Sequence, residues 1–183
     1  MNSVWNVIRS GVATLDYLTE NIGKAISWLN LVLVLIVFFV VILRYLLNIG
    51  SIAMQESAMY LHAIIFLGAS GYTLKHDGHV RVDVFYRKMS ARQKALVNSL
   101  GTLFLLIPVC LFVGFMSWEY ISNSWRVLET SQDPGGIPYV YLLKSLIMFM
   151  VVTLLLQGVA ELLRSLMVLF TRHEVHAGVE DHG

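Results

Sequence analysis

The feature that most constrains this sequence is the unbroken apolar run from Leu31 to Leu43. It lies within a segment, residues 25–47, that is as long as the roughly 20 residues a helix needs to cross a hydrocarbon core of about 30 Å. No charged residue interrupts the middle of this segment. The sequence therefore predicts a membrane-spanning helix here.

Composition excludes a soluble domain. Of the 183 residues, 57% are hydrophobic and only 14% are charged, and the mean hydropathy is +0.69, which leaves too little polar side-chain area to cover a soluble protein of this size. A formal net charge of +1 indicates neither a nucleic acid nor an acidic partner. The single cysteine, Cys110, lies in an apolar run and is interpreted as a buried, inert thiol.

Three further apolar segments predict three more spans, roughly at residues 54–74, 96–116 and 139–162. The third span follows Ser90 and Gln93, which have the spacing of a capping box and mark a helix start. Pro108 is expected to kink this span. The fold class is thus an all-α integral membrane protein, with one four-helix transmembrane domain over residues 1–172 and a flexible tail over 173–183.

Two amphipathic helices are expected along the membrane surface. In the N-terminal segment, apolar residues recur at three- and four-residue steps: Val4, Ile8, Leu15, Leu18 and Ile22. This spacing favours an interfacial helix, the alternative being a solvated leader. In the middle of the chain, Asp83 is a candidate N-cap for a short surface helix over residues 84–89.

One ion pair is predicted between the first two spans. Arg44 lies about one turn before the short link at residues 48–51, and Glu56 lies about one turn after the second helix starts. Equal depth on adjacent helices favours pairing, since pairing lowers the cost of charge near hydrocarbon. In the alternative, Arg44 extends to lipid headgroups and Glu56 complements its own helix N-terminus.

The spans lack the residues that several membrane chemistries require. Haem held by two histidines needs a second ligand, but His62 is the only histidine within a span. His62 is therefore interpreted as a hydrogen-bonded structural residue between helices rather than a proton relay. The ionisable residues Glu56, Lys144 and Glu161 lie near span ends, so no self-contained ion-coupled carrier site is predicted.

The tail offers no metal site of its own. Its histidines, His173, His176 and His182, are interpreted as solvated, because no ordered element spaces them as ligands. The sequence predicts no catalytic, cofactor-binding or metal-binding residue, and no enzyme.

A set of short elements resembles a known family. These elements are Arg44-Tyr45 followed by Asn48, then Gln55-Glu56, Gly68-Ala69, His79-x-Arg81-x-Asp83 and Gly136-Ile137-Pro138. In this combination they resemble the small four-helix membrane subunit (DctQ-type) of tripartite ATP-independent periplasmic, or TRAP, transporters. The resemblance extends from the first span to about Tyr139.

The resemblance implies a scaffold subunit in the bacterial cytoplasmic (inner) membrane. In such a system a periplasmic solute-binding protein delivers an organic acid anion to a large, elevator-type membrane subunit, which uses a sodium gradient. The small subunit braces the large one, helps to dock the binding protein and needs no cofactor. Its structural or subunit-interface candidates are Arg44, Gln55, Glu56, Gly68, His79, Arg81 and Asp83. A quinone-binding anchor of a redox complex and a stand-alone small transporter are the alternatives.

Basic residues predict the orientation of the chain. They are concentrated between the second and third spans, at Lys75, Arg81, Arg87, Lys88, Arg92 and Lys94, and lysine and arginine are absent from the link at residues 48–51. Because positively charged loops remain in the cytoplasm, both termini and the middle loop are predicted to be cytoplasmic. Periplasm-active reporters should therefore be active when fused after Asn48 or Gly135 and inactive after Arg87 or His176. The opposite pattern would contradict this orientation.

Overall fold

A computed structural model describes the backbone of residues 2–78 and 86–177. Within these residues the chain is helical, with α1 (Asn2–Leu46), α2 (Ile52–Gly68), α3 (Ser70–Lys75), α5 (Ala91–Gly101), the π-helix η1 (Thr102–Leu106), α6 (Ile107–Arg126) and α7 (Val140–Ala177). Four helical stretches of this described part are long and apolar enough to cross a membrane: Asn6–Leu46, Ile52–Lys75, Ala91–Arg126 and Val140–Phe170. The predicted all-α class with four spans is confirmed. The candidates His79, Arg81 and Asp83 lie outside the described residues.

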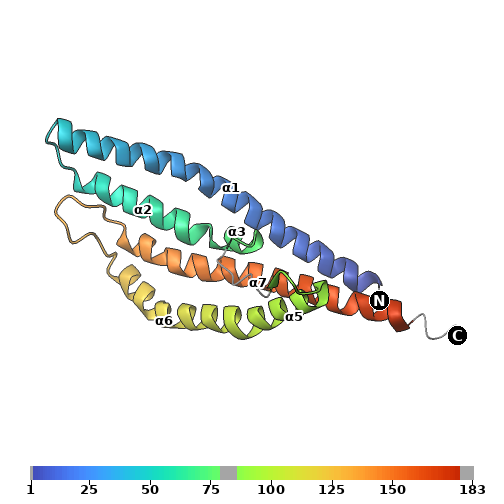
Figure 1. Cartoon of the computed structure of the whole chain (residues 1–183). Coiled ribbons are helices and arrows are strands. Elements are labelled where there is room, and N and C mark those ends of the chain that lie inside the picture. Colours follow the sequence, from blue (N-terminus) through green and yellow to red (C-terminus); the bar gives the residue numbers. More distant parts are fainter. Residues whose placement is uncertain (1, 79–85, 178–183) are drawn as a thin grey trace.

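Helix α7 is the element on which the other spans pack. It contacts α1, α2, α3, α5 and α6, and Figure 1 shows it between α2 and α6, with α1 beyond α2. Such an arrangement encloses few side chains. Gln157 and Ala160 of α7 are fully buried. In contrast, no residue in the most apolar stretch of α1 is buried. Most of the apolar surface of α1 and α6 therefore faces outward, as suits a membrane.

The N-terminal segment does not form a separate surface helix. It is continuous with the first span in α1, whose 45 residues cover about 68 Å, more than twice the thickness of a hydrocarbon core. Val12 is buried, and Asp16 accepts hydrogen bonds from Arg164 of α7. These contacts hold the segment alongside α7, which explains why it continues the direction of the span instead of turning along the membrane surface.

Glycines allow the helices to approach closely at the junction of α2 and α3. A Cβ on Gly68 would lie 2.7 Å from Ile26 Cδ1 of α1, and a Cβ on Gly71 would lie 3.0 Å from the Thr153 carbonyl oxygen of α7. Close packing of small residues is a main source of helix association in lipid. Gly68, a candidate from the sequence, is thus placed at a contact within the chain.

The start of the third span confirms the predicted capping box. Ser90 Oγ accepts from Gln93 N at 3.4 Å, and Gln93 Oε1 accepts from Ser90 N at 2.8 Å. Further along, the helix widens into η1 just before Pro108. Proline has no N–H and its ring crowds the preceding turn, so a π-helical turn is one way to absorb the disturbance.

Gly71 provides a test of this packing. Gly71→Leu should lower the free energy of unfolding by about 1–3 kcal/mol, because the new side chain meets the backbone of α7. Gly101→Leu is the matched control, since a Cβ at Gly101 would meet no atom of another described part of the chain within 4 Å. Thermal unfolding in detergent, followed by tryptophan fluorescence, would measure both. An equal loss in the two variants would contradict close packing at Gly71.

Candidate functional site

A polar network joins α1 to α7 at the end of the molecule where α1 begins and α7 ends (Figure 1). Arg164 Nη2 donates to both carboxylate oxygens of Asp16, at 2.8 and 3.0 Å. Gln157 donates to Asp16 at 3.2 Å and accepts from Thr19 Oγ1 at 3.0 Å. Gln157 is fully buried and both ends of its amide are bonded, so its burial does not leave the amide unsatisfied.

Glu20 extends this network from α1 to the end of α3. Its carboxylate lies 2.7 Å from Lys75 Nζ, 2.9 Å from His76 Nε2 and 3.2 Å from Lys24 Nζ. Lys75 Nζ also donates to the Asp16 carbonyl oxygen at 3.0 Å. These bonds fix the end of α3 against α1.

The same network reaches α5 through Glu161. Arg164 Nη1 donates to Glu161, Asn98 Nδ2 donates to Glu161 at 3.4 Å, and Tyr86 OH donates to Asn98 at 3.1 Å. Pairing makes charge tolerable near hydrocarbon, and here it ties all four spans together. We call the whole set the terminal-end network: Asp16, Thr19, Glu20, Lys24, Lys75, His76, Tyr86, Asn98, Gln157, Glu161 and Arg164.

At the opposite end, Glu56 of α2 holds the loop over residues 127–139. Its carboxylate accepts from Ser131 Oγ and, at 2.5 Å, from the backbone N–H of Ile137. The predicted ion pair with Arg44 is wrong: in the described part of the chain Glu56 has these loop donors instead, and Arg44 is exposed. The loop folds back over the start of α2, so its donors reach the carboxylate. The exposure of Arg44 agrees with the alternative in which it extends to headgroups.

Glu129 fixes the same loop to α6 and α7. It accepts from Lys144 and, at 2.6 Å, from Ser124 Oγ, and Lys144 Nζ lies 3.9 Å from the centre of the Tyr120 ring. We call Glu56, Tyr120, Ser124, Glu129, Ser131, Ile137 and Lys144 the loop-end network.

These bonds also set the charge of Glu129. The hydrogen bond from Lys144, followed by that from Ser124, lowers the pKa of Glu129 below its usual 4.5. A carboxyl group whose pKa is lower in the folded than in the unfolded state stabilises the fold at pH values above its unfolded-state pKa. That stabilisation is lost as the pH falls through its folded-state pKa. Glu129 is therefore ionised at neutral pH, where it holds the loop.

His62 is placed differently from its prediction. Its side chain is exposed on α2, with its ring stacked on Phe66 at a centroid distance of 6.3 Å. Among residues 2–78 and 86–177, no hydrogen bond joins it to another helix. Gln55, a sequence candidate, is also exposed on α2.

The terminal-end network was missed as a unit by reasoning from sequence. A signal was present, because Asp16 and Glu20 are four residues apart and so lie on one helix face. Arg164 lies just beyond the uncharged part of the last span. Pairing these residues requires knowing that α1 and α7 extend past the membrane side by side, which their spacing does not reveal.

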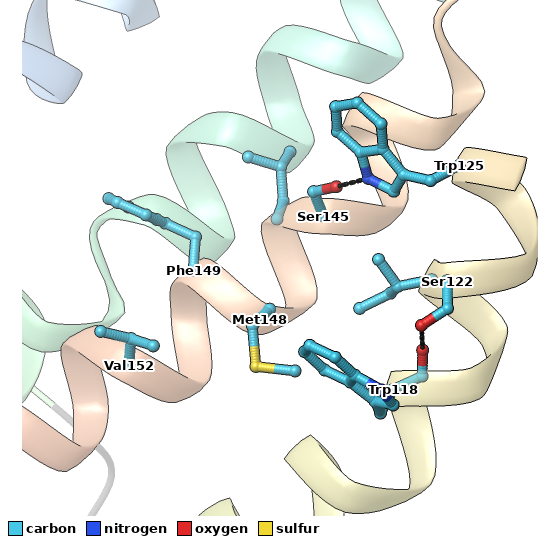
Figure 2. Close-up of a pocket in the computed structure, with 9 residues that line it drawn as sticks. Trp118, Ser122, Trp125, Ser145, Met148, Phe149 and Val152 are labelled. Atoms are coloured by element: carbon cyan, nitrogen blue, oxygen red, sulfur yellow. Dashed lines mark hydrogen bonds between the residues drawn. The ribbon is translucent and has the colours of Figure 1, made fainter. Parts of the chain in front are cut away.

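A groove of about 620 Å³ lies between α6 and α7 (Figure 2). Its nine lining residues are apolar or neutral: Trp118, Ile121, Ser122, Trp125, Ser145, Leu146, Met148, Phe149 and Val152. Trp125 Nε1 donates to Ser145 Oγ at 2.8 Å. This lining offers no charge to hold an organic anion. Within the described residues, no group of three or more histidine, cysteine, aspartate or glutamate side chains is placed to hold a metal ion.

Comparison with known families identifies the chain. The family described as the DctQ component of tripartite ATP-independent periplasmic transporters matches residues 33–167, well over half of the sequence. The chain belongs to this family. It is therefore a multi-pass component of a transporter in the bacterial inner membrane and not an enzyme. DctQ components work with a large TRAP membrane subunit and a periplasmic binding protein. Comparisons with curated proteins and with solved structures gave no match.

The matched range excludes one side of the terminal-end network. Asp16, Thr19 and Glu20 precede residue 33, whereas their partners on α3 and α7 lie within the match. The N-terminal half of α1 is thus attached by polar bonds to the part of the DctQ chain that the family model covers.

The Asp16–Arg164 pair should contribute measurably to stability. The two side chains are about one-quarter and just over one-third exposed, so a coupling free energy of about 1–2 kcal/mol is expected from a double-mutant cycle with Asp16→Asn and Arg164→Gln. Unfolding in detergent, followed by tryptophan fluorescence, would give it. Lys24→Gln is the control, since Lys24 is 66% exposed and, among the described residues, pairs with Glu20 of the same helix. A coupling no larger than the effect of Lys24→Gln would contradict the assigned role.

Proposed function

We propose that this DctQ chain is a rigid scaffold that braces the large TRAP membrane subunit during sodium-coupled uptake of an organic acid anion. The observation that carries the proposal is that a polar network joins all four spans at one end, while at the other end a second network joins α2, α6 and α7 through the loop over residues 127–139. A transport domain that moves by an elevator mechanism needs a part that stays still. A subunit whose helices are joined by these networks resists tilting and can enlarge that fixed part.

The loop end is the proposed docking surface for the periplasmic solute-binding protein. The orientation predicted from the basic residues places this end in the periplasm. Glu56 and Glu129 hold the loop on α2, α6 and α7, while Gln132 and Asp133 are exposed on it. A loop that is ordered before binding loses less conformational entropy on docking, which favours affinity.

The solute and the coupling ion are proposed to bind to the large subunit. The ionisable side chains Glu56, Lys144 and Glu161 are bonded within the polar networks, and the α6–α7 groove is lined by uncharged residues. We accordingly expect this chain to need no cofactor. Its place in a transporter family favours this assignment over a quinone-binding redox anchor.

Reconstitution tests the proposal directly. Proteoliposomes would contain this chain, the large subunit or both, each supplied with the binding protein, radiolabelled organic anion and a sodium gradient. Uptake is expected only when both membrane subunits are present. Uptake by this chain alone would support a stand-alone transporter, and full uptake by the large subunit alone would show that the scaffold is dispensable.

A further inference from the structure

One outward face of α2 carries polar side chains into the membrane. Ile52, Gln55, Met59, His62 and Phe66 are spaced three or four residues apart, so they lie on one side of the helix. All five are exposed, Phe66 at 72% and Met59 at 52%. We call this set the α2 face.

The α2 face points away from the rest of the chain. At 3.6 residues per turn, its members lie on the side of the helix roughly opposite Gly68, and Gly68 is the residue that meets Ile26 of α1. The contacts that α2 makes within the subunit therefore leave this face uncovered.

By its position along the second span, His62 is expected to lie within the hydrocarbon core. It is ten residues beyond the start of the span Ile52–Lys75 and six residues beyond Glu56, which corresponds to about 9–15 Å along a helix that crosses a core of about 30 Å. An imidazole that faces lipid at this depth loses its hydration without replacement, and polar side chains in such positions almost always face protein or water. The nearby Phe66 ring, whose centroid is 6.3 Å from that of the imidazole, offers no hydrogen bond to its nitrogens.

Two other outward stretches make no such demand. On α1 the exposed side chains between Leu31 and Leu43 are apolar, and on α6 the same is true of Leu111, Phe112 and Phe115. Lipid tails satisfy such surfaces fully. A histidine within the span therefore distinguishes the α2 face from these two stretches and favours a protein partner for it.

We propose that a membrane-spanning helix of the large TRAP subunit packs on the α2 face and places a hydrogen-bonding group opposite His62. This inference rests on the proposed function, in which the two membrane subunits form a complex. Gln55 lies on the same face, about one turn from the start of α2, and its amide provides a second polar contact for the same partner helix.

Cross-linking tests which surface the large subunit covers. In a Cys110→Ala background, which removes the chain's single cysteine, single cysteines would be introduced by Met59→Cys or Phe66→Cys on the α2 face. The matched controls are Val34→Cys on α1 and Phe112→Cys on α6, since both native side chains are 63% exposed. Each variant would carry a benzophenone maleimide and be irradiated in membranes that also contain the tagged large subunit. The two α2 positions should give adducts with the large subunit, and the controls should give several-fold less.

A second measurement keeps the native cysteine. His62→Leu should lower the amount of small subunit that co-purifies with the tagged large subunit several-fold, because the partner's polar group loses its hydrogen bond. His62→Gln retains a donor and an acceptor and should restore most of the complex. Phe112→Leu is the control and should leave the yield of complex unchanged. An undiminished yield with His62→Leu would overturn the hydrogen bond to the partner helix.

The outcomes separate this inference from the proposed function. If the wild-type subunits form a complex and transport together, but adducts arise equally from all positions or mainly from the two control positions, only the assignment of the α2 face is overturned. Adducts between two small subunits through positions 59 and 66 would overturn it in favour of a second copy. If the wild-type subunits do not associate at all, the scaffold proposal fails and this inference fails with it.

Discussion

The bond between Asp16 and Arg164 is the interaction on which the arrangement of the helices depends. It joins residues separated by 148 positions in the sequence and holds the first helix against the last. Gln157 and Glu161 bond to the same two side chains, so the pair is also the centre of the terminal-end network. Without it, the part of α1 that precedes the membrane span would lose its main polar attachment to α7.

Polar bonds are important for holding these helices together because the surrounding solvent is lipid. Lipid tails are as apolar as leucine, so burying one apolar helix against another gains little in a bilayer. Helices are then held by close contact at small residues and by hydrogen bonds. This chain uses glycines within the spans, such as Gly71 against Thr153, and charged side chains at both ends. The large apolar faces that the subunit leaves uncovered are consistent with helices held together by small residues and polar bonds.

The sequence was sufficient to predict what depends on local chemistry. Apolar run lengths predicted four spans, and Ser90 with Gln93 predicted a helix start, because each signal lies within a short stretch of chain. The partner of Glu56 was not predictable in this way. Its donors come from a loop 75 or more residues away, and only the folded path of that loop brings them close. The continuity of α1 was missed for a similar reason, since its N-terminal half is positioned by α7.

The central position of α7 has a consequence for biosynthesis. The ribosome makes α7 after α1, α2, α3, α5 and α6, yet all of these helices pack on it. Until it is inserted, the earlier spans lack the surface that sets their spacing, and the carboxylates of Asp16 and Glu56 lack partners that lie at or beyond residue 131. Packing of these helices is therefore completed by α7, and quality control in the membrane meets an incompletely packed set of helices until α7 is inserted.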